Sequence, residues 1–267
     1  MTLRHWISAL AVAGLLFGAS AALAAEKKPL REPDAFGSLQ TPSLEQARSQ
    51  AQDWLKATGK MDDATQKAFA EIWDQPDRPV LNRVTDTLAL GNADAAKLLD
   101  EARDPGTAAP KVVPSLIKDT KLPAYFRGNL ALAYAKALSN RRVYEEALDA
   151  LAVVRPEQVV DPSAYFFHRA VAEHALIRKN DAIRSIARLL DDVTDAPDRY
   201  RLVALLMFVD MQSWKEKDLD WIARKMDNIE RRLELARGGP QTQKIQREVV
   251  ARLDEIIKEL ENRKKGS

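Results

Sequence analysis

The sequence predicts an all-α protein, and three observations lead to that fold class. Apolar residues recur at three- and four-residue spacings in one segment after another, which is the period of an amphipathic helix. Residues with branched β-carbons never form the alternating run that marks a half-buried strand. Only 10 glycines occur in 267 residues, whereas alanine, leucine, arginine, glutamate and aspartate dominate.

The chain has no cysteine, and its charges nearly balance, with 41 Lys and Arg against 39 Asp and Glu. Without cysteine there can be no disulfide framework, no thiolate metal site and no thiol for a lipid anchor. A chain this close to neutral lacks the basic surplus of nucleic-acid-binding proteins, so no nucleic-acid partner is expected.

Residues 1–24 have the three parts of a secretory signal peptide. Arg4 supplies a basic start, residues 7–22 form an apolar run, and Ala22-Leu23-Ala24 is the expected cleavage triplet. The alternative is an uncleaved anchor, but the run is shorter than the ~20 residues of a spanning helix. We therefore expect an exported protein, periplasmic or extracellular, with no integral membrane span once the signal is removed.

Residues 25–42 carry three prolines, several charges and little apolar material, which predicts an extended linker. N-terminal helical hairpins are expected over residues 43–103, beginning at the N-cap Ser43, whose capping box is completed by Gln46. Each hairpin has a single apolar stripe, so each must bury that stripe against a neighbour. Residues 104–123 are rich in turn formers, and we expect a linker with a short helix that separates two domains.

Residues 124–238 are expected to form helical repeats, of which the first two hairpins are the clearest because each is opened by a proline. The first helix of each hairpin is apolar nearly all round, which is typical of a helix covered on several sides. The second helix of the first hairpin has one apolar stripe, which begins at Tyr144 and predicts the burial of that side chain. Arg141 and Arg142, between the two helices, are expected on a solvated turn.

The stretch Val143-Tyr144-Glu145-Glu146-Ala147-Leu148 resembles the aromatic-x-Glu-Ala core that begins the second helix of a tetratricopeptide repeat. Ala147 and Ala182 occupy equivalent places in successive second helices, and their separation is close to the ~34-residue period of that family. The sequence departs from the family where the first helix should carry Leu-Gly, since it has Tyr134-Ala135 and Arg169-Ala170. The resemblance implies a right-handed α-solenoid of helical hairpins and a general role in interaction, and it identifies no ligand.

The resemblance also implies that the first helix of each hairpin lines a concave face. The residues that this register turns toward the face are Asn129, Lys136, Asn140, Val171 and His174. Asn and Lys on successive turns could hold a peptide carboxylate or backbone, so we treat the four polar residues Asn129, Lys136, Asn140 and His174 as candidate binding residues. The alternative is that they are polar positions on a solvated surface.

Residues 202–209 form the most apolar run after the signal, and this short run is expected to be a core helix and not a membrane span. Residues 239–267 predict a long C-terminal amphipathic helix. The apolar positions of its seam alternate four- and three-residue steps at Val249, Leu253, Ile256 and Leu260. The seam is expected either to cap the end of the repeats or to form a homo-oligomer.

The sequence contains no GxGxxG, GxxxxGK[ST] or GxSxG pattern, so no phosphate loop or nucleophile elbow is predicted. His168 and His174 would point ~120° apart on one helix and could not share a metal ion. The acid pair Glu145-Glu146 and the arginine pair Arg231-Arg232 are expected on solvated helix faces. We therefore predict no catalytic residue, no metal and no cofactor.

The predicted function is that of an exported, non-catalytic scaffold that binds a protein or peptide in the cell envelope. Two alternatives stay open. One is a cell-envelope enzyme, such as a polysaccharide-cleaving protein, in which carboxylates from different hairpins converge on a pocket. The other is a structural protein that self-assembles through its C-terminal helix.

Overall fold

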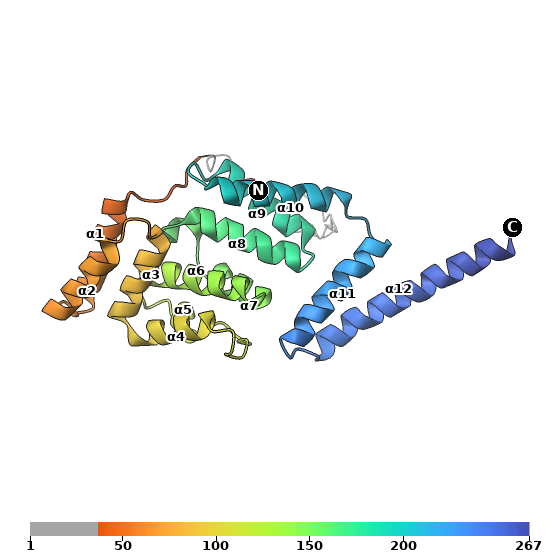
Figure 1. The fold of residues 1–267 in the computed structure, drawn as a ribbon, viewed down its shortest axis with the longest axis horizontal. Helices are drawn as coiled ribbons and strands as arrows, with labels where there is room; N and C mark the ends of the chain where they lie inside the picture. The colour runs from red at the N-terminus through yellow and green to blue at the C-terminus, as the bar shows by residue number, and fades with distance from the viewer. Residues whose placement is uncertain (1–36, 267) are drawn as a thin grey trace, which may run out of the picture. The chain divides into compact units, whose positions relative to one another are not determined.

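In the computed structural model, which describes residues 37–266, the chain forms twelve α-helices and one short 3₁₀ helix, with no β-strand among those residues (Figure 1). The predicted all-α class is confirmed. The predicted signal peptide, residues 1–24, and most of the predicted linker, residues 25–42, lie outside the described residues. None of the described helices is both long and apolar enough to cross a membrane.

The first four helices are α1 (Leu44–Ala57), α2 (Asp63–Trp73), α3 (Val80–Gly91) and α4 (Ala93–Arg103). Side-chain caps fix the starts of three of them, at Ser43, Asp62 and Asn92. Ser43 forms the predicted capping box with Gln46. The other three helices, α1, α2 and α4, all pack against α3. Their apolar stripes are therefore buried against this one helix.

The short helix predicted within residues 104–123 is present as α5 (Ser115–Lys118), which packs on α6 (Ala124–Asn140). α3 and α4 also pack on α6. Helices on both sides of residues 104–123 are thus in direct contact, and all described residues belong to one compact unit.

Two hairpins follow the same plan. In the first, α6 pairs with α7 (Tyr144–Ala152), and after the 3₁₀ helix η1 (Pro156–Gln158) the second pairs α8 (Pro162–Ala175) with α9 (Lys179–Asp191). α7 packs on α8 and so joins the hairpins. Their turns match, because Arg142 and Ile177 both have φ of 61° and follow the same pattern of helix-ending hydrogen bonds.

The expectation that residues 202–209 form a core helix is wrong. They belong to α10 (Asp198–Ser213), which packs on α8 and α9 but buries only Tyr200, Ala204 and Met211. The next helix, α11 (Leu219–Glu234), packs on α12 (Pro240–Lys265) and leaves α10 uncovered. Six large apolar side chains of α10 are therefore exposed: Leu202, Val203, Leu205, Leu206, Phe208 and Val209.

The C-terminal seam is divided between two environments. Val249 is buried and Ile256 half-buried, whereas Leu253 and Leu260 are exposed. The prediction of one four-residue seam is therefore wrong, because packing on α11 takes up Val249 and leaves a different stripe of α12 to solvent.

The described end of the predicted linker, residues 37–42, is held against the chain between α9 and α10. The Leu39 N–H donates to the carbonyl of Asp192 at 3.0 Å, and the Leu39 carbonyl accepts from Thr194 at 3.0 Å. Thr41 donates its N–H to the carboxylate of Asp195 at 3.0 Å. Residues 37–42 are therefore anchored to the chain by these hydrogen bonds.

Candidate functional site

A polar pocket of about 260 Å³ lies between α3, α4 and α6. Lys136 and Asn140, two of the four predicted binding residues, line it from successive turns of α6. The other polar lining residues come from segments preceding or within α3 and from the end of α4: Arg78, Asn82, Thr85, Asp86 and Arg103.

The pocket has more positive than negative charge. Arg78 is paired with Asp86, whereas Arg103 and Lys136 form no ion pair within residues 37–266. Burial lowers the pKa of Lys136, and the charges of Arg199 and Arg103 lower it further, against the opposing effect of Asp161. An anion in the pocket would relieve the repulsion between these positive charges. Asn82 and Asn140 could donate hydrogen bonds to it.

Asn129 is not available to a ligand, and its prediction as a binding residue is wrong. Its side chain is fully buried, donates Nδ2 to the carbonyl of Tyr125 and accepts the Val160 N–H at Oδ1, both at 2.8 Å. The Asn129 side-chain amide therefore links the segment after η1 to α6. A polar side chain in an otherwise apolar helix gives the same sequence signal whether it serves packing or binding.

His174 lies away from the pocket, on α8 facing α10. Its Nε2 is 2.8 Å from Asp210 Oδ2, and its ring lies 5.0 Å from that of Trp214. Asp210 also accepts from Trp214 Nε1 at 3.0 Å, so the three side chains form one cluster. Val171, on the same helix, is half-buried. The structure thus brings together Lys136 and Asn140 but not Asn129 or His174.

His168 is buried among aromatic rings on another face of α8. Its ring lies 5.3 Å from Phe167 and 6.3 Å from Tyr200, and neither ring nitrogen has a hydrogen-bond partner among the described residues. Burial, with a smaller effect of the Lys136 charge, lowers its pKa to about 4. Within residues 37–266 no group of three or more His, Asp or Glu side chains could hold a metal ion.

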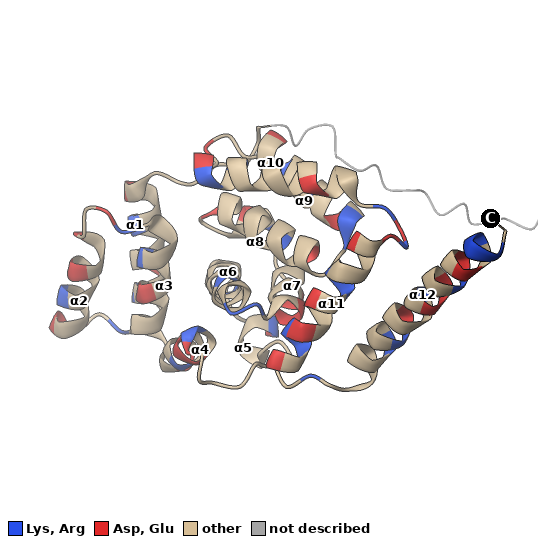
Figure 2. Ribbon diagram, turned by 45° about the vertical axis from the view of Figure 1, so that its right-hand side comes forward, with Lys and Arg blue, Asp and Glu red and all other residues tan. Residues whose placement is uncertain are grey.

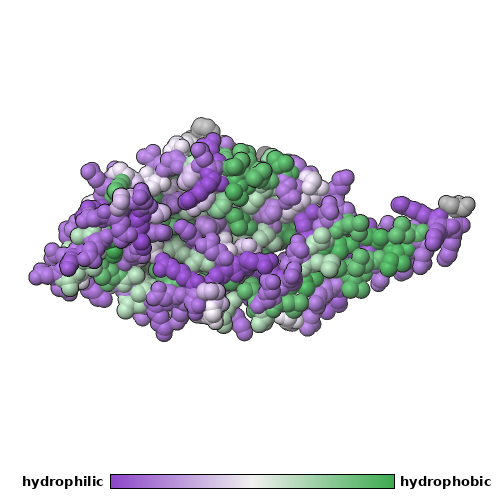
Figure 3. Space-filling view, viewed as in Figure 1, coloured by the Kyte–Doolittle hydropathy of each residue, from purple (hydrophilic) through white to green (hydrophobic). Residues whose placement is uncertain are grey.

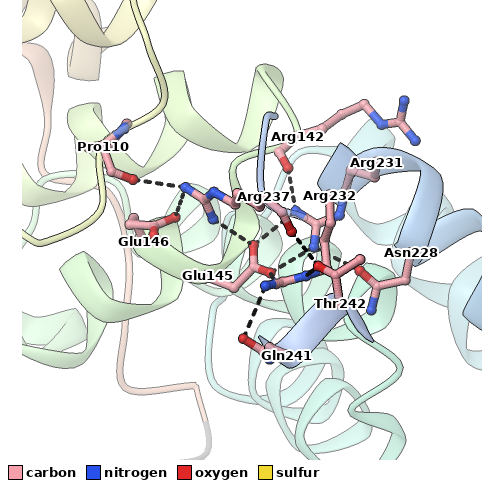
Figure 4. Close-up of polar contacts among 10 residues, drawn as sticks. All are labelled: Pro110, Arg142, Glu145, Glu146, Asn228, Arg231, Arg232, Arg237, Gln241 and Thr242. Carbon is pink, nitrogen blue, oxygen red and sulfur yellow. Dashed lines mark hydrogen bonds and ion pairs between the residues drawn. The ribbon is translucent and has the colours of Figure 1, made fainter. Parts of the chain in front are cut away.

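Arg231 and Arg232 were expected on a solvated face, but both are buried in a cluster with Glu145 (Figure 4). Arg231 donates Nη1 and Nη2 to the two carboxylate oxygens of Glu145 at 2.9 and 2.8 Å. Arg237 donates to Glu146 at 2.9 Å. Figure 2 shows acidic and basic residues gathered where α11 approaches α7. The prediction failed because neighbouring residues on a helix give no sign of a partner far away in sequence.

The cluster attaches the α11–α12 hairpin to the first repeat. Burial alone would raise the pKa of Glu145, but the hydrogen bonds and charges of Arg231 and Arg232 outweigh it and hold the pKa below its ordinary value. Both carboxylate oxygens of Glu145 thus accept hydrogen bonds from arginines. The acid pair that could have suited acid–base chemistry serves as a structural link.

Exposed apolar side chains gather in two patches on the described part of the chain (Figure 3). One is the uncovered face of α10 described above, and the other runs along the α11–α12 hairpin, where a groove of about 620 Å³ includes Met226, Leu233 and Val250. The α10 surface was not foreseen, and for α12 the sequence left open whether its seam would be covered, because a stripe read from sequence does not say which neighbour will cover it. No model of a known protein family, no curated protein and no solved structure matches the chain.

Proposed function

We propose that this chain is an exported, non-catalytic helical scaffold that binds an acidic peptide segment of another protein. The observation that carries the proposal is the pocket between α3, α4 and α6, where Arg103 and Lys136 have no carboxylate partner among the described residues. Asn82 and Asn140, which also line the pocket, add amide donors. A peptide carboxylate matches this combination of cations and amides.

The scaffold part of the proposal is supported by the repetition of the hairpins. The matched turns at Arg142 and Ile177, and the packing of α7 on α8, are what stacked repeats would produce. We infer a short right-handed solenoid related to tetratricopeptide repeats. Export is inferred from residues 1–24 alone, and replacing Leu15 and Leu16 by arginine should leave an unprocessed precursor in the cytoplasm.

Peptide binding is tested by fluorescence anisotropy with a labelled peptide of Asp and Glu that ends in a free α-carboxylate. Removing one charge-assisted hydrogen bond costs ~1.5–3 kcal/mol, so Lys136→Ala and Arg103→Ala should each raise Kd roughly tenfold or more. Lys97→Ala is the matched control, because Lys97 lies on the same helix as Arg103 and its side chain is 77% exposed.

Equal binding by the three variants, or no binding by the parent protein, would overturn the pocket assignment. The rival function, cleavage of an envelope polysaccharide, has its own readout. Release of new reducing ends from envelope glycans by the purified protein would overturn the non-catalytic proposal whatever the peptide data show.

A further inference from the structure

The α11–α12 hairpin exposes one continuous apolar face. It consists of seven large side chains, each between 39% and 68% exposed: Leu219, Met226, Leu233, Val250, Leu253, Ile257 and Leu260. Three of them, Leu219, Met226 and Leu233, recur every two turns along α11, and the other four follow one stripe of α12. This face is distinct from the positions that hold the hairpin together, Ile222 and Val249, which are buried.

α12 also extends beyond its partner helix. α11 has 16 residues and α12 has 26, so about ten residues, or ~15 Å of helix, have no counterpart in α11. The start of α11 is level with Arg252, whose Nε donates to the carbonyl of Lys217 at 2.6 Å. The uncovered end therefore includes Ile257 and Leu260, both more than half exposed.

The exposed stripe of α12 is symmetric about residue 255. Its members stand at 250, 253, 257 and 260, so the steps are three, four and three in either direction. An antiparallel copy of α12 centred at residue 255 would set Val250 opposite Leu260 and Leu253 opposite Ile257. Every apolar position would then meet an apolar position, as a two-fold interface requires.

In the same antiparallel register, charged residues of opposite sign on the two copies also face each other. Asp227 and Glu230 are exposed on the rim of the groove between α11 and α12. Since Lys225 pairs with Glu248 at 2.6 Å, Asp227 is level with Gln246, and the residue opposite Gln246 in the antiparallel copy is Lys264. The basic end of one α12, with Lys264 and Lys265, would thus lie against the acidic rim of the other groove.

We propose that a second copy of this chain occupies the exposed face of the α11–α12 hairpin, with the two α12 helices antiparallel and the free end of each in the groove of the other. In this register Leu233 is level with residue 240 and lies beyond the end of the partner helix, so the partner covers the other six side chains. Six half-exposed apolar side chains of ~100 Å² each amount to roughly 600 Å² per copy, against the ~800 Å² per partner of a standard specific interface. The two grooves are equivalent, so the assembly closes as a dimer and does not propagate.

Sedimentation velocity of the purified chain at tens of micromolar tests the proposal. The parent should sediment as a dimer, and Ile257→Asp with Leu260→Asp as a monomer. Leu202→Asp on α10 is the control, since Leu202 is as exposed as Leu260 but lies off the proposed face and should leave the dimer intact. A monomeric parent, a dimer that survives Ile257→Asp with Leu260→Asp, or a dimer that is lost in the Leu202 control would each overturn it.

Charge reversal provides a test that does not depend on removing apolar surface. Asp227→Lys with Glu230→Lys, and separately Lys264→Glu with Lys265→Glu, should each weaken the dimer at least ~tenfold at low salt. An equimolar mixture of the two variants should restore it, because each tail then meets a groove of opposite charge. Failure of the mixture to restore association would contradict the proposed register.

The absence of cysteine allows the orientation to be tested directly. Val250→Cys mixed with Leu260→Cys should form an intermolecular disulfide on mild oxidation, whereas Leu260→Cys alone should not. Two copies of position 260 would be ~15 Å apart in the antiparallel register, beyond the reach of a disulfide. Efficient crosslinking of Leu260→Cys to itself would mean that the helices are parallel and the proposal is wrong.

Discussion

Arg231 on α11 donates two hydrogen bonds, of 2.9 and 2.8 Å, to the carboxylate of Glu145 on α7, although the residues lie 86 positions apart in the sequence. The Arg231 side chain is almost completely buried, and its guanidinium carbon lies 5.2 Å from the centre of the Tyr144 ring. The position of α11 against the first repeat is thus set by a buried ion pair, and the surface that the α11–α12 hairpin presents depends on that pair.

Glu145→Ala is expected to be strongly destabilising. It would leave Arg231 and Arg232 buried without their carboxylate, and breaking a buried pair in this way costs about 3–5 kcal/mol. The loss should appear as a lower urea midpoint and as faster amide exchange in α11. Glu234→Ala is the matched control, because Glu234 pairs with Arg142 and both side chains are about half exposed. That change should cost less than ~1 kcal/mol, and equal effects of the two variants would contradict the linking role of Glu145.

Stability should fall as the pH is lowered from 7 to 5, and His168 should account for much of the change. The unfolded chain protonates this imidazole near pH 6.5, whereas the folded protein does so only near its lowered pKa of about 4. The contribution of His168 to the free energy of unfolding is therefore complete above pH 6.5 and is lost as the pH falls toward 4. Between pH 7 and 5 the expected loss is on the order of 2 kcal/mol.

His168→Leu isolates that contribution, since leucine has no proton to bind. The free energy of unfolding, measured by urea titration at several pH values, should depend less on pH between 7 and 5 in this variant. Comparison with the parent is needed because burial raises the pKa values of Glu173 and Asp161, which titrate in the opposite sense. Parallel pH profiles for the two proteins would show that the imidazole protonates freely in the folded state.

Arg141 should prove more important than its place in a predicted solvated turn indicates. It donates Nη1 to the carbonyls of Glu101 and Ala102, at 3.0 and 3.2 Å, and Nη2 to the carbonyl of Thr107. Arg141→Ala would remove the charged donor that closes the end of α4 and should cost about 1–3 kcal/mol in thermal or urea denaturation. The neighbouring Arg142→Ala loses only an exposed ion pair and should cost less than ~1 kcal/mol.

The same region revises the expectation for Tyr144. The sequence stripe predicted a fully buried ring between the two hairpins, but the ring is half-buried and lies under the Arg231 guanidinium. A helical period identifies the face on which a side chain lies and not the element that covers it. Here the cover comes from α11, which no local pattern could have indicated.

Local rules succeeded where the determining contacts are local. The Ser43–Gln46 capping box, the short helix α5 and the all-round burial of α6 follow from spacings within a few residues, and all three are present. Two residues of the candidate pocket, Lys136 and Asn140, were predicted from the sequence because they lie one turn apart on α6. Arg78, Asn82 and Arg103 were missed because tertiary packing of α3 and α4 brings them there.

Gly128→Ala is expected to destabilise the protein although alanine is the better helix former. A Cβ at this position in α6 would lie 2.4 Å from the backbone carbonyl oxygen of Gln158, at the end of η1. Helix propensity favours alanine by ~1 kcal/mol, but overpacking a tight contact typically costs 1–3 kcal/mol, and this contact is with backbone that cannot rotate away.

The shift that relieves the Gly128 clash should also strain the neighbouring bond from Val160 N–H to Asn129 Oδ1, which is 2.8 Å long. We therefore expect a net loss of about 1–3 kcal/mol in urea denaturation and faster exchange of the Val160 amide. Gly266→Ala at the end of α12 is the control, since its Cβ would meet nothing closer than 3.6 Å and the change should stay within ~0.5 kcal/mol. If Gly128→Ala instead stabilised the protein by the full propensity gain, the close approach of η1 to α6 would be wrong.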